Sequence, residues 1–210
     1  MLSKKEYLEM LNQRHTPQIQ EKLTAGKVAV AGLGGLGSHV AIGLARIGVG
    51  NLHLVDFDTV EPSNLNRQSY KIADLGKEKT LALKEEIQEI NPYINVYTHT
   101  VQVTAKNAVK LFAQEDIICE AFDNPIAKAM LVNTILEQSP HTKIVASSGM
   151  AGFESSNEIH TKKIRNNFYL CGDGKNGIES GMGLMAPRVM VCAGHQGNMI
   201  VRLLLNTEHA

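Results

Sequence analysis

The feature that most constrains this chain is a glycine-rich segment, GLGGLGS, at residues 32–38. It follows an apolar β-rich run, KVAVA, and precedes an apolar helical segment, HVAIGLARIG. Gly32, Gly34 and Gly37 match G-x-G-x-x-G in the strand-turn-helix setting that binds phosphate, because glycines allow a tight turn and the helix N-terminus offers unpaired N–H groups. Asp56 closes the next β-rich run, where a carboxylate accepts hydrogen bonds from ribose. The pattern predicts a nucleotide site.

Short β-rich runs alternate with helical segments along the chain. The predicted strands are 27–31, 52–55, 94–97, 117–120 and 143–146. A predicted helix over 77–90 stops at Asn91-Pro92, Asn124 reads as the N-cap of a second helix, and a third begins near Pro187. This alternation predicts an α/β fold, with a Rossmann-like, mostly parallel sheet flanked by helices.

The length of 210 residues and a hydrophobic content of 43% suit a single domain with a sizeable core. No repeat or linker divides it, so one domain is expected over residues 1–210, with an N-terminal helical arm at 1–25. Residues 149–183 are rich in Gly, Ser and Asn, with one β-like run at 158–164. The glycine-dense part, 172–185, is expected to be a mobile surface loop in the C-terminal third.

Charge and cysteine content exclude several classes of protein. Lys and Arg number 21 against 21 Asp and Glu, so bulk electrostatic binding to nucleic acid or to an anionic membrane is not expected. The N-terminus has no apolar signal region, and charged residues interrupt the apolar C-terminal stretch. The three cysteines form no Cys-x-x-Cys pair. A cytoplasmic protein is therefore expected.

Three later motifs distinguish ATP from a dinucleotide as the ligand. They are DFDTVEPSNLNRQ at 56–68, GKEK at 76–79 and EAFDNP at 120–125. ATP carries more charge than a dinucleotide and usually brings a cation, so its site needs extra cationic and carboxylate groups. Arg67, Lys79 and Asp123 supply such groups after strands or at the start of helices, on the edge where α/β sheets bind ligands.

These motifs, in this order, resemble those of the ThiF/MoeB/HesA family, relatives of ubiquitin-activating enzymes that adenylate the C-terminal glycine of small sulfur carriers. The similarity runs from about Arg14 to the C-terminal helix. Within the family, ICEAFDNPIAKAMLV, SSGMAG, FYLCGDG and GLMAPRV most resemble the compact thiamin-biosynthesis ThiF subgroup. The resemblance implies ATP- and Mg²⁺-dependent adenylylation of a ubiquitin-like, ThiS-like carrier ending in Gly-Gly, with release of pyrophosphate, by a homodimer.

The resemblance also implies roles for individual residues. The ATP-binding positions are Gly32, Gly34, Gly35, Gly37, Asp56, Asn64, Arg67 and Lys79. Among these, Asp56 is expected to hold the ribose, and Arg67 and Lys79 the phosphates. Asp123 is expected to coordinate Mg²⁺. Arg14 matches an arginine that in relatives reaches the nucleotide of the partner subunit.

The cysteines depart from the family pattern. Many relatives bind zinc through two Cys-x-x-Cys pairs, which this chain lacks, so no zinc is expected. Some relatives place a reactive cysteine shortly before the helix that begins here near Pro187, a place filled by Glu179 or a neighbour. Cys171 has two interpretations, a covalent site for the carrier in an accessible loop or a half-buried thiol left from an ancestral zinc site. Cys119 and Cys192 are expected in the core.

Two alternatives use the same glycine turn. The first is an NAD-dependent oxidoreductase, but no tyrosine of the chain is followed by Lys four positions later, as the Tyr-x-x-x-Lys dyad of such enzymes requires. The second is a nucleotide-binding scaffold without turnover. The combination of Arg67, Lys79 and Asp123 argues against a scaffold, since binding alone does not require this full set.

Overall fold

The computed structural model describes residues 2–177 and 181–209. Its centre is one sheet of seven strands in the order β3-β2-β1-β4-β5-β7-β6. The strands are β1 (Lys27–Ala31), β2 (Asn51–Asp56), β3 (Asn95–Thr100), β4 (Ile117–Glu120), β5 (Lys143–Ser147), β6 (His160–Arg165) and β7 (Phe168–Gly172). Every neighbouring pair is parallel except β6 and β7. The predicted mostly parallel α/β sheet is confirmed.

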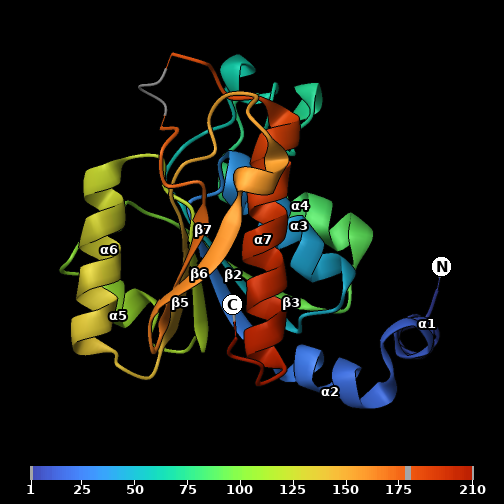
Figure 1. Ribbon diagram of the computed structural model, residues 1–210. Helices are drawn as coiled ribbons and strands as arrows, with labels where there is room; N and C mark the ends of the chain where they lie inside the picture. The colour runs from blue at the N-terminus through green and yellow to red at the C-terminus, as the bar shows by residue number, and fades with distance from the viewer. Residues whose placement is uncertain (1, 178–180, 210) are drawn as a thin grey trace.

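Helices cover both faces of the sheet. They are α1 (Lys4–His15), α2 (Pro17–Ala25), α3 (Gly35–Arg46), α4 (Lys79–Ile90), α5 (Ala108–Leu111), α6 (Pro125–Gln138) and α7 (Ala186–Leu204), with short 3-10 turns at Pro62–Asn64, Ile72–Asp74 and Ser156–Glu158. In Figure 1, α5 and α6 cover one face and α3, α4 and α7 the other. In the described part of the chain, no helix combines the length and apolarity needed to cross a bilayer.

The buried strands explain the two-sided core. In β1, Val28 and Val30 pack into the apolar cluster on the side of α3 and α7, whereas Ala29 and Ala31 pack into the cluster with α6. Successive side chains of a strand point to opposite faces, so a strand that is covered on both sides is apolar throughout. This is why KVAVA shows no polar alternation.

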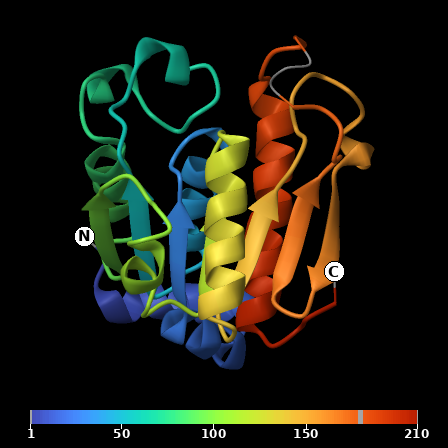
Figure 2. The same cartoon turned by 90° about the vertical axis from the view of Figure 1, so that its left-hand side faces the viewer.

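The helical arm lies at the amino edge of the sheet. The Tyr7 hydroxyl in α1 donates to the carbonyl oxygen of Ile90, which ends α4, at 3.2 Å. The Leu23 carbonyl in α2 accepts from the N–H of Gly50, just before β2, at 3.0 Å. Figure 2 shows this arm beneath the sheet, with the parallel strands pointing away from it. The carboxyl edge of the sheet is therefore left open.

The C-terminal third differs from the sequence expectation. Residues 168–172 form β7, which pairs in parallel with β5, although the sequence pattern predicts no strand there. The run FYLCG is short and lies among glycine and asparagine residues, so its apolar positions give little strand signal. Because β7 lies between β5 and β6, its side chains become part of the core.

Candidate functional site

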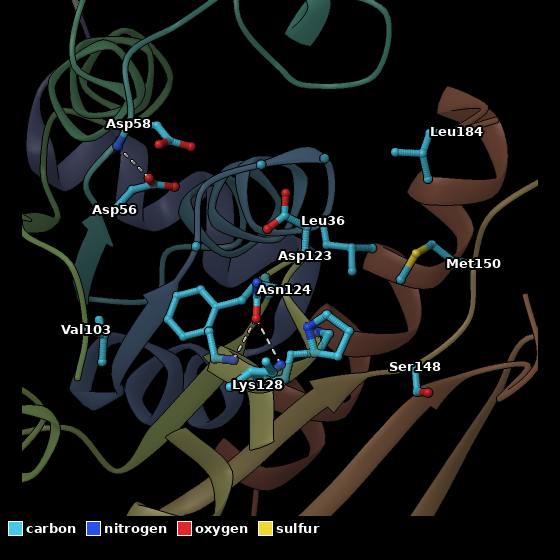
Figure 3. Close-up of a pocket in the computed structure, with 18 of the residues that line it drawn as sticks. Leu36, Asp56, Asp58, Val103, Asp123, Asn124, Lys128, Ser148, Met150 and Leu184 are labelled. Atoms are coloured by element: carbon cyan, nitrogen blue, oxygen red, sulfur yellow. Dashed lines mark hydrogen bonds between the residues drawn. The ribbon is translucent and has the colours of Figure 1, made fainter. Parts of the chain in front are cut away.

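A cleft of about 1000 Å³ opens at the carboxyl edge of the sheet. Segments that follow β1 to β5 line it, together with residues 174–177 and the start of α7. Figure 3 shows Asp56 and Asp58 on one side, Met150 and Leu184 on the other, and Asp123 between them. This is the edge at which open α/β sheets bind ligands.

The glycine turn joins β1 to α3 at the edge of the cleft. Gly34 is the N-cap of α3 and provides no side-chain cap, so the N–H groups of the first helical turn have no intrahelical partners, and Gly34, Gly35 and Leu36 line the cleft. Gly32 has a φ of 91°, and a Cβ atom on Gly37 would lie 1.8 Å from the carbonyl oxygen of Gly32. The turn therefore requires glycine at both positions.

Asp56 holds this turn in place. Its side chain is buried at the end of β2, where Oδ2 accepts the N–H of Leu33 at 2.6 Å and Oδ1 accepts the N–H of Asp58 at 2.9 Å. Each carboxylate oxygen has a second lone pair. The geometry thus leaves acceptor capacity on the cleft side for ribose hydroxyl groups.

Arg67 lies over the glycine turn. Asn64 is buried, and its Oδ1 atom accepts the N–H of Glu61 at 3.0 Å, which shapes the 3-10 turn before Arg67. Arg67 donates from Nη1 to the Ser63 carbonyl at 3.0 Å and to the Asn66 side chain at 2.8 Å. Both Asn64 and Arg67 line the cleft. The guanidinium retains N–H groups for an anion.

Lys79 forms an ion pair that the sequence analysis did not include. Lys79 is the first residue of α4 and is 6% exposed, and its Nζ lies 2.8 Å from Oδ2 of Asp58. Asp58 is half-exposed and also lines the cleft. The sequence signal for Asp58 as a cleft residue is its position two residues after Asp56, because alternate residues of an extended segment point the same way. A phosphate that binds Lys79 therefore has to compete with Asp58 or share the cation with it.

Asp123 is exposed in the cleft, immediately before the cap of α6. The predicted cap is confirmed, since Oδ1 of Asn124 accepts the N–H groups of Ile126 and Ala127 at 2.9 and 3.0 Å. No group of three or more His, Cys, Asp or Glu side chains able to hold a metal ion occurs among the described residues. Mg²⁺ is usually bound by one or two carboxylates together with phosphates, so Asp123 fits this mode.

Glu120, Lys128 and Ser147 form a buried network that sequence reasoning missed. Glu120 is fully buried at the end of β4, and Lys128 in α6 donates to its two oxygens at 2.9 and 3.1 Å and to the Ser147 hydroxyl at 3.1 Å. Burial raises the pKa of Glu120, against the opposing effect of Lys128. Glu120 also accepts the N–H of Phe122 at 2.7 Å, so the network fixes the chain that carries Asp123.

Gln68 is an incompletely satisfied polar group beside the glycine turn. Its side chain is 8% exposed, lines the cleft and has a buried Oε1 atom without a partner in the described structure. Its Nε2 lies 3.8 Å from the position of a Cβ atom on Gly34. A buried polar atom without a partner is costly, and a bound polar ligand removes that cost. A cleft with this amide, the α3 N-terminus, Arg67 and Lys79 fits a nucleotide phosphate.

Arg14 lies away from this cleft. It is exposed in the last turn of α1, in the helical arm at the amino edge of the sheet. The cleft-lining residues follow the opposite, carboxyl ends of the strands. Of the predicted site residues, the structure brings together the glycines, Asp56, Asn64, Arg67, Lys79 and Asp123, but within one chain it does not bring Arg14 to them.

Cys171 is not in an accessible loop, so that expectation is wrong. It lies in β7 with 0% exposure, and burial raises its pKa to about 11, although the Thr161 hydroxyl opposes this increase. Cys119 and Cys192 are also fully buried, as predicted. A buried thiol of raised pKa carries little thiolate and reacts slowly. The geometry therefore favours the interpretation of Cys171 as a structural thiol.

The predicted mobile loop at 172–185 is only partly described. Gly172–Gly177 make hydrogen bonds to residues 148–151, including Gly174 N–H to the Ser148 carbonyl at 2.9 Å. This part of the loop is thus held by hydrogen bonds to the segment that follows β5. Glu179, at or next to the position expected to correspond to the reactive cysteine of some relatives, lies outside the described residues.

Comparisons with known proteins identify the family of this chain. The sequence profile of the ThiF family matches residues 7–210. A probable adenylyltransferase/sulfurtransferase MoeZ from Mycobacterium tuberculosis is 43% identical over 115 residues, or 54% of this chain and 29% of that protein. A molybdopterin-synthase adenylyltransferase from Haemophilus influenzae is 38% identical over 133 residues, or 63% of this chain and 53% of that protein. The match thus covers about half or less of each relative's length.

Solved structures share the fold. The E. coli tRNA N6-threonylcarbamoyladenosine dehydratase TcdA, crystallised with ATP, superposes with a TM-score of 0.87 at 18% identity, over 98% of this chain and 97% of that one. E. coli MccB with ATP gives 0.70 at 23% identity, over 90% and 59%. The family profile runs through every motif that lines the cleft, from the glycine turn to the start of α7, and the chain therefore belongs to the ThiF family.

Proposed function

We propose that this protein is an adenylyltransferase that activates the C-terminal carboxylate of a small ubiquitin-like sulfur carrier with ATP. The observation that carries the proposal is the meeting of Arg67, Lys79 and Asp123 with the glycine turn in one cleft. Relatives named as adenylyltransferases, among them a sulfur carrier protein adenylyltransferase of Thermus thermophilus at 38% identity, support it. The cleft contains both the cations and the carboxylate that MgATP needs, beyond what a dinucleotide requires.

The chemistry follows from the charges of the cleft. A carboxylate oxygen of the carrier attacks the α-phosphorus of ATP, the bond to the bridging oxygen breaks, and pyrophosphate leaves. No general base is needed, because a carboxylate is already ionised at neutral pH. Arg67, Lys79 and the α3 N-terminus neutralise phosphate charge as it develops. Asp123 would hold Mg²⁺, which when bound supplies further charge neutralisation.

The thiamin pathway and a cytoplasmic location are the finer parts of the proposal. They depend on the resemblance of FYLCGDG and GLMAPRV to the compact ThiF subgroup and on the free, unpaired cysteines. One matched relative is named for molybdopterin synthesis. Carrier choice depends on protein contacts outside the ATP motifs. Exchange activity measured with thiamin-type and molybdopterin-type carriers separates these pathways.

We also propose a homodimer in which Arg14 of one copy completes the cleft of the other. The support is the position of Arg14 at the opposite edge of the sheet from its own cleft. Arg14→Ala and Asp123→Ala subunits are each expected to be inactive. Co-expressed, they form heterodimers with one intact site, so activity should return to roughly a quarter of the wild-type value. No recovery, or a monomer in sedimentation, would contradict this arrangement.

ATP–pyrophosphate exchange tests the function itself. Exchange should require a carrier ending in Gly-Gly, and Asp123→Ala should abolish it while circular dichroism stays unchanged. Asp116→Ala, at the amino end of β4 and away from the cleft, is the matched control. MgATP binding without carrier-dependent exchange would indicate a scaffold, and NADH binding without MgATP binding an oxidoreductase.

A further inference from the structure

A buried ion pair lies behind one wall of the cleft. Nη2 of Arg188, in the first turn of α7, is 2.6 Å from Oδ2 of Asp173, which follows β7. The side chains are 4% and 1% exposed, the most completely buried pair among the described residues. The Nε atom of Arg188 has no hydrogen-bond partner among the described residues. Burying two charges has a desolvation cost that offsets much of their attraction, so stability alone does not explain this geometry.

The pair joins separate segments of the chain. Nη1 of Arg188 donates to the carbonyl oxygens of Glu154 and Ser155 at 2.5 and 2.7 Å. Oδ1 of Asp173 accepts the N–H groups of Lys175 and Asn176 at 2.8 and 2.9 Å. Burial opposes ionisation of Asp173, but these N–H groups and Arg188 outweigh it and lower its pKa to about 2. Asp173 therefore stays ionised at neutral pH.

The turn at 173–177 is bound tightly to residues 148–151. Gly149 has a φ of 78°, and a Cβ atom there would lie 2.0 Å from Oδ1 of Asp173. Asp173 N–H donates to the Gly149 carbonyl at 3.0 Å, and the Asn176 carbonyl accepts the N–H groups of Met150 and Ala151, each at 3.0 Å. The carboxylate is thus packed against the backbone that it orders.

These two segments form one wall of the cleft. Ser148–Met150 and Gly174–Gly177 line it, whereas β1, β2 and α4 supply the nucleotide half. Figure 3 shows Ser148 and Met150 on the side away from Asp56 and Asp58. None of the hydrogen bonds of the ion pair reaches the nucleotide half. The ion pair therefore acts directly on this wall.

We infer that Asp173 and Arg188 are positioning residues for the carboxylate-bearing substrate and not for the nucleotide. This inference rests on the proposed function. The wall is rich in glycine, which lets the backbone approach a narrow, extended chain end such as Gly-Gly. Its exposed Lys175, whose N–H is fixed by Asp173, gives the wall a cation suited to a terminal carboxylate.

Asp173→Asn tests the inference, because it preserves size and an acceptor oxygen but removes the charge that holds Arg188. Misplaced reacting groups cost roughly 10-fold to 10²-fold, so kcat/KM for the carrier should fall by that factor. The Kd for MgATP should stay within about 2-fold of the wild-type value, as expected when the substituted site is independent of nucleotide binding. Amide exchange at Met150, Ala151 and Gly174 should accelerate. Glu208→Gln, which removes surface ion pairs to Lys143 and Lys163, is the control.

Lys175→Gln is the second variant, since an exposed side chain can be replaced without loss of the fold. It should raise the KM for the carrier and leave the Kd for MgATP unchanged. Two outcomes would overturn this inference and leave the proposed function standing. One is an equal fold-loss in kcat/KM for the carrier and in affinity for MgATP in folded Asp173→Asn. The other is a KM for the carrier that is unchanged in both variants. A wild-type protein without exchange on any carrier would overturn the proposed function, and this inference with it.

Discussion

The buried carboxylate of Asp56 and the backbone N–H of Leu33 are joined by a hydrogen bond of 2.6 Å. This bond links the end of β2 to the glycine turn after β1, two segments that a ligand at the carboxyl edge contacts together. Asp56 therefore shapes the glycine turn, and in the proposed function it also accepts hydrogen bonds from ribose. The expected ligand contact and the structural contact use the same side chain.

Asp56→Ala should accordingly weaken both the fold and nucleotide binding. Two backbone donors, of Leu33 and Asp58, lose their acceptor, so the free energy of unfolding should fall by about 1–3 kcal/mol. The glycine turn loses its support and the proposed ribose contact is removed, so affinity for MgATP should fall by about 10-fold or more. Urea unfolding and calorimetric titration measure the two effects, with Asp116→Ala as control. Normal MgATP affinity in Asp56→Ala would exclude a role for Asp56 in the site.

Gly37→Ala should be among the most destabilising alanine substitutions in the chain. Its Cβ atom would lie 1.8 Å from the carbonyl oxygen of Gly32, so backbone has to move, at a cost of about 3 kcal/mol or more. Gly43, in the same helix, has nothing within 4 Å of its Cβ position. Gly43→Ala should therefore stabilise by about 0.5–1 kcal/mol. Similar thermal midpoints for the two variants would refute this geometry.

Lys79→Met should reduce the exchange rate by about 10²-fold or more, because one cation facing the phosphates is lost. Asp58, its partner at 2.8 Å, is half-exposed and stays hydrated, so stability should change little. Initial-rate assays at saturating ATP measure the loss. Lys22→Met, on an exposed helix face at the amino edge, is the control and should retain full activity. Equal rates in both variants would remove Lys79 from the site.

The three thiols should resist modification in the folded protein. Cys119, Cys171 and Cys192 are fully buried, and burial raises the pKa of Cys171 to about 11 and of Cys192 to about 12. Labelling by N-ethylmaleimide at neutral pH should be slow until denaturant is added, and Cys171→Ala should keep exchange activity. Rapid labelling of Cys171 in the folded protein would contradict its burial.

Asp173 should contribute to acid sensitivity. Its pKa is lowered from an ordinary value of 3.8 to about 2, so its contribution to stability is complete above about pH 4 and is lost as pH falls toward about 2. Asp173→Asn lacks this contribution. The difference in unfolding free energy between wild type and variant should therefore shrink over that interval. A difference that stays constant from neutral pH to pH 2 would contradict the lowered pKa.

The sequence predicts those parts of the fold that short-range patterns encode. Apolar runs predict β1 and β4 at their observed bounds, and Asn124 predicts the start of α6, because strand periodicity and helix capping are local effects. The glycine spacing and Asp56 predict the phosphate turn for the same reason. β7 was missed because its short run lies within a glycine-rich region and pairs with β5, its non-sequential neighbour.

Contacts between elements depend on the tertiary structure. The pairs Lys79–Asp58, Lys128–Glu120 and Arg188–Asp173 join segments that meet only once the strands are ordered in the sheet. The same ordering buries Cys171 between β5 and β6 and places Arg14 at the edge away from the cleft. Local sequence patterns are sufficient to predict the α/β architecture, the glycine turn after β1 and the cations and carboxylates proposed to bind a triphosphate. Which charges neutralise one another and which thiols are inaccessible follows from the folded arrangement, because burial and ion pairing depend on neighbours distant in the chain.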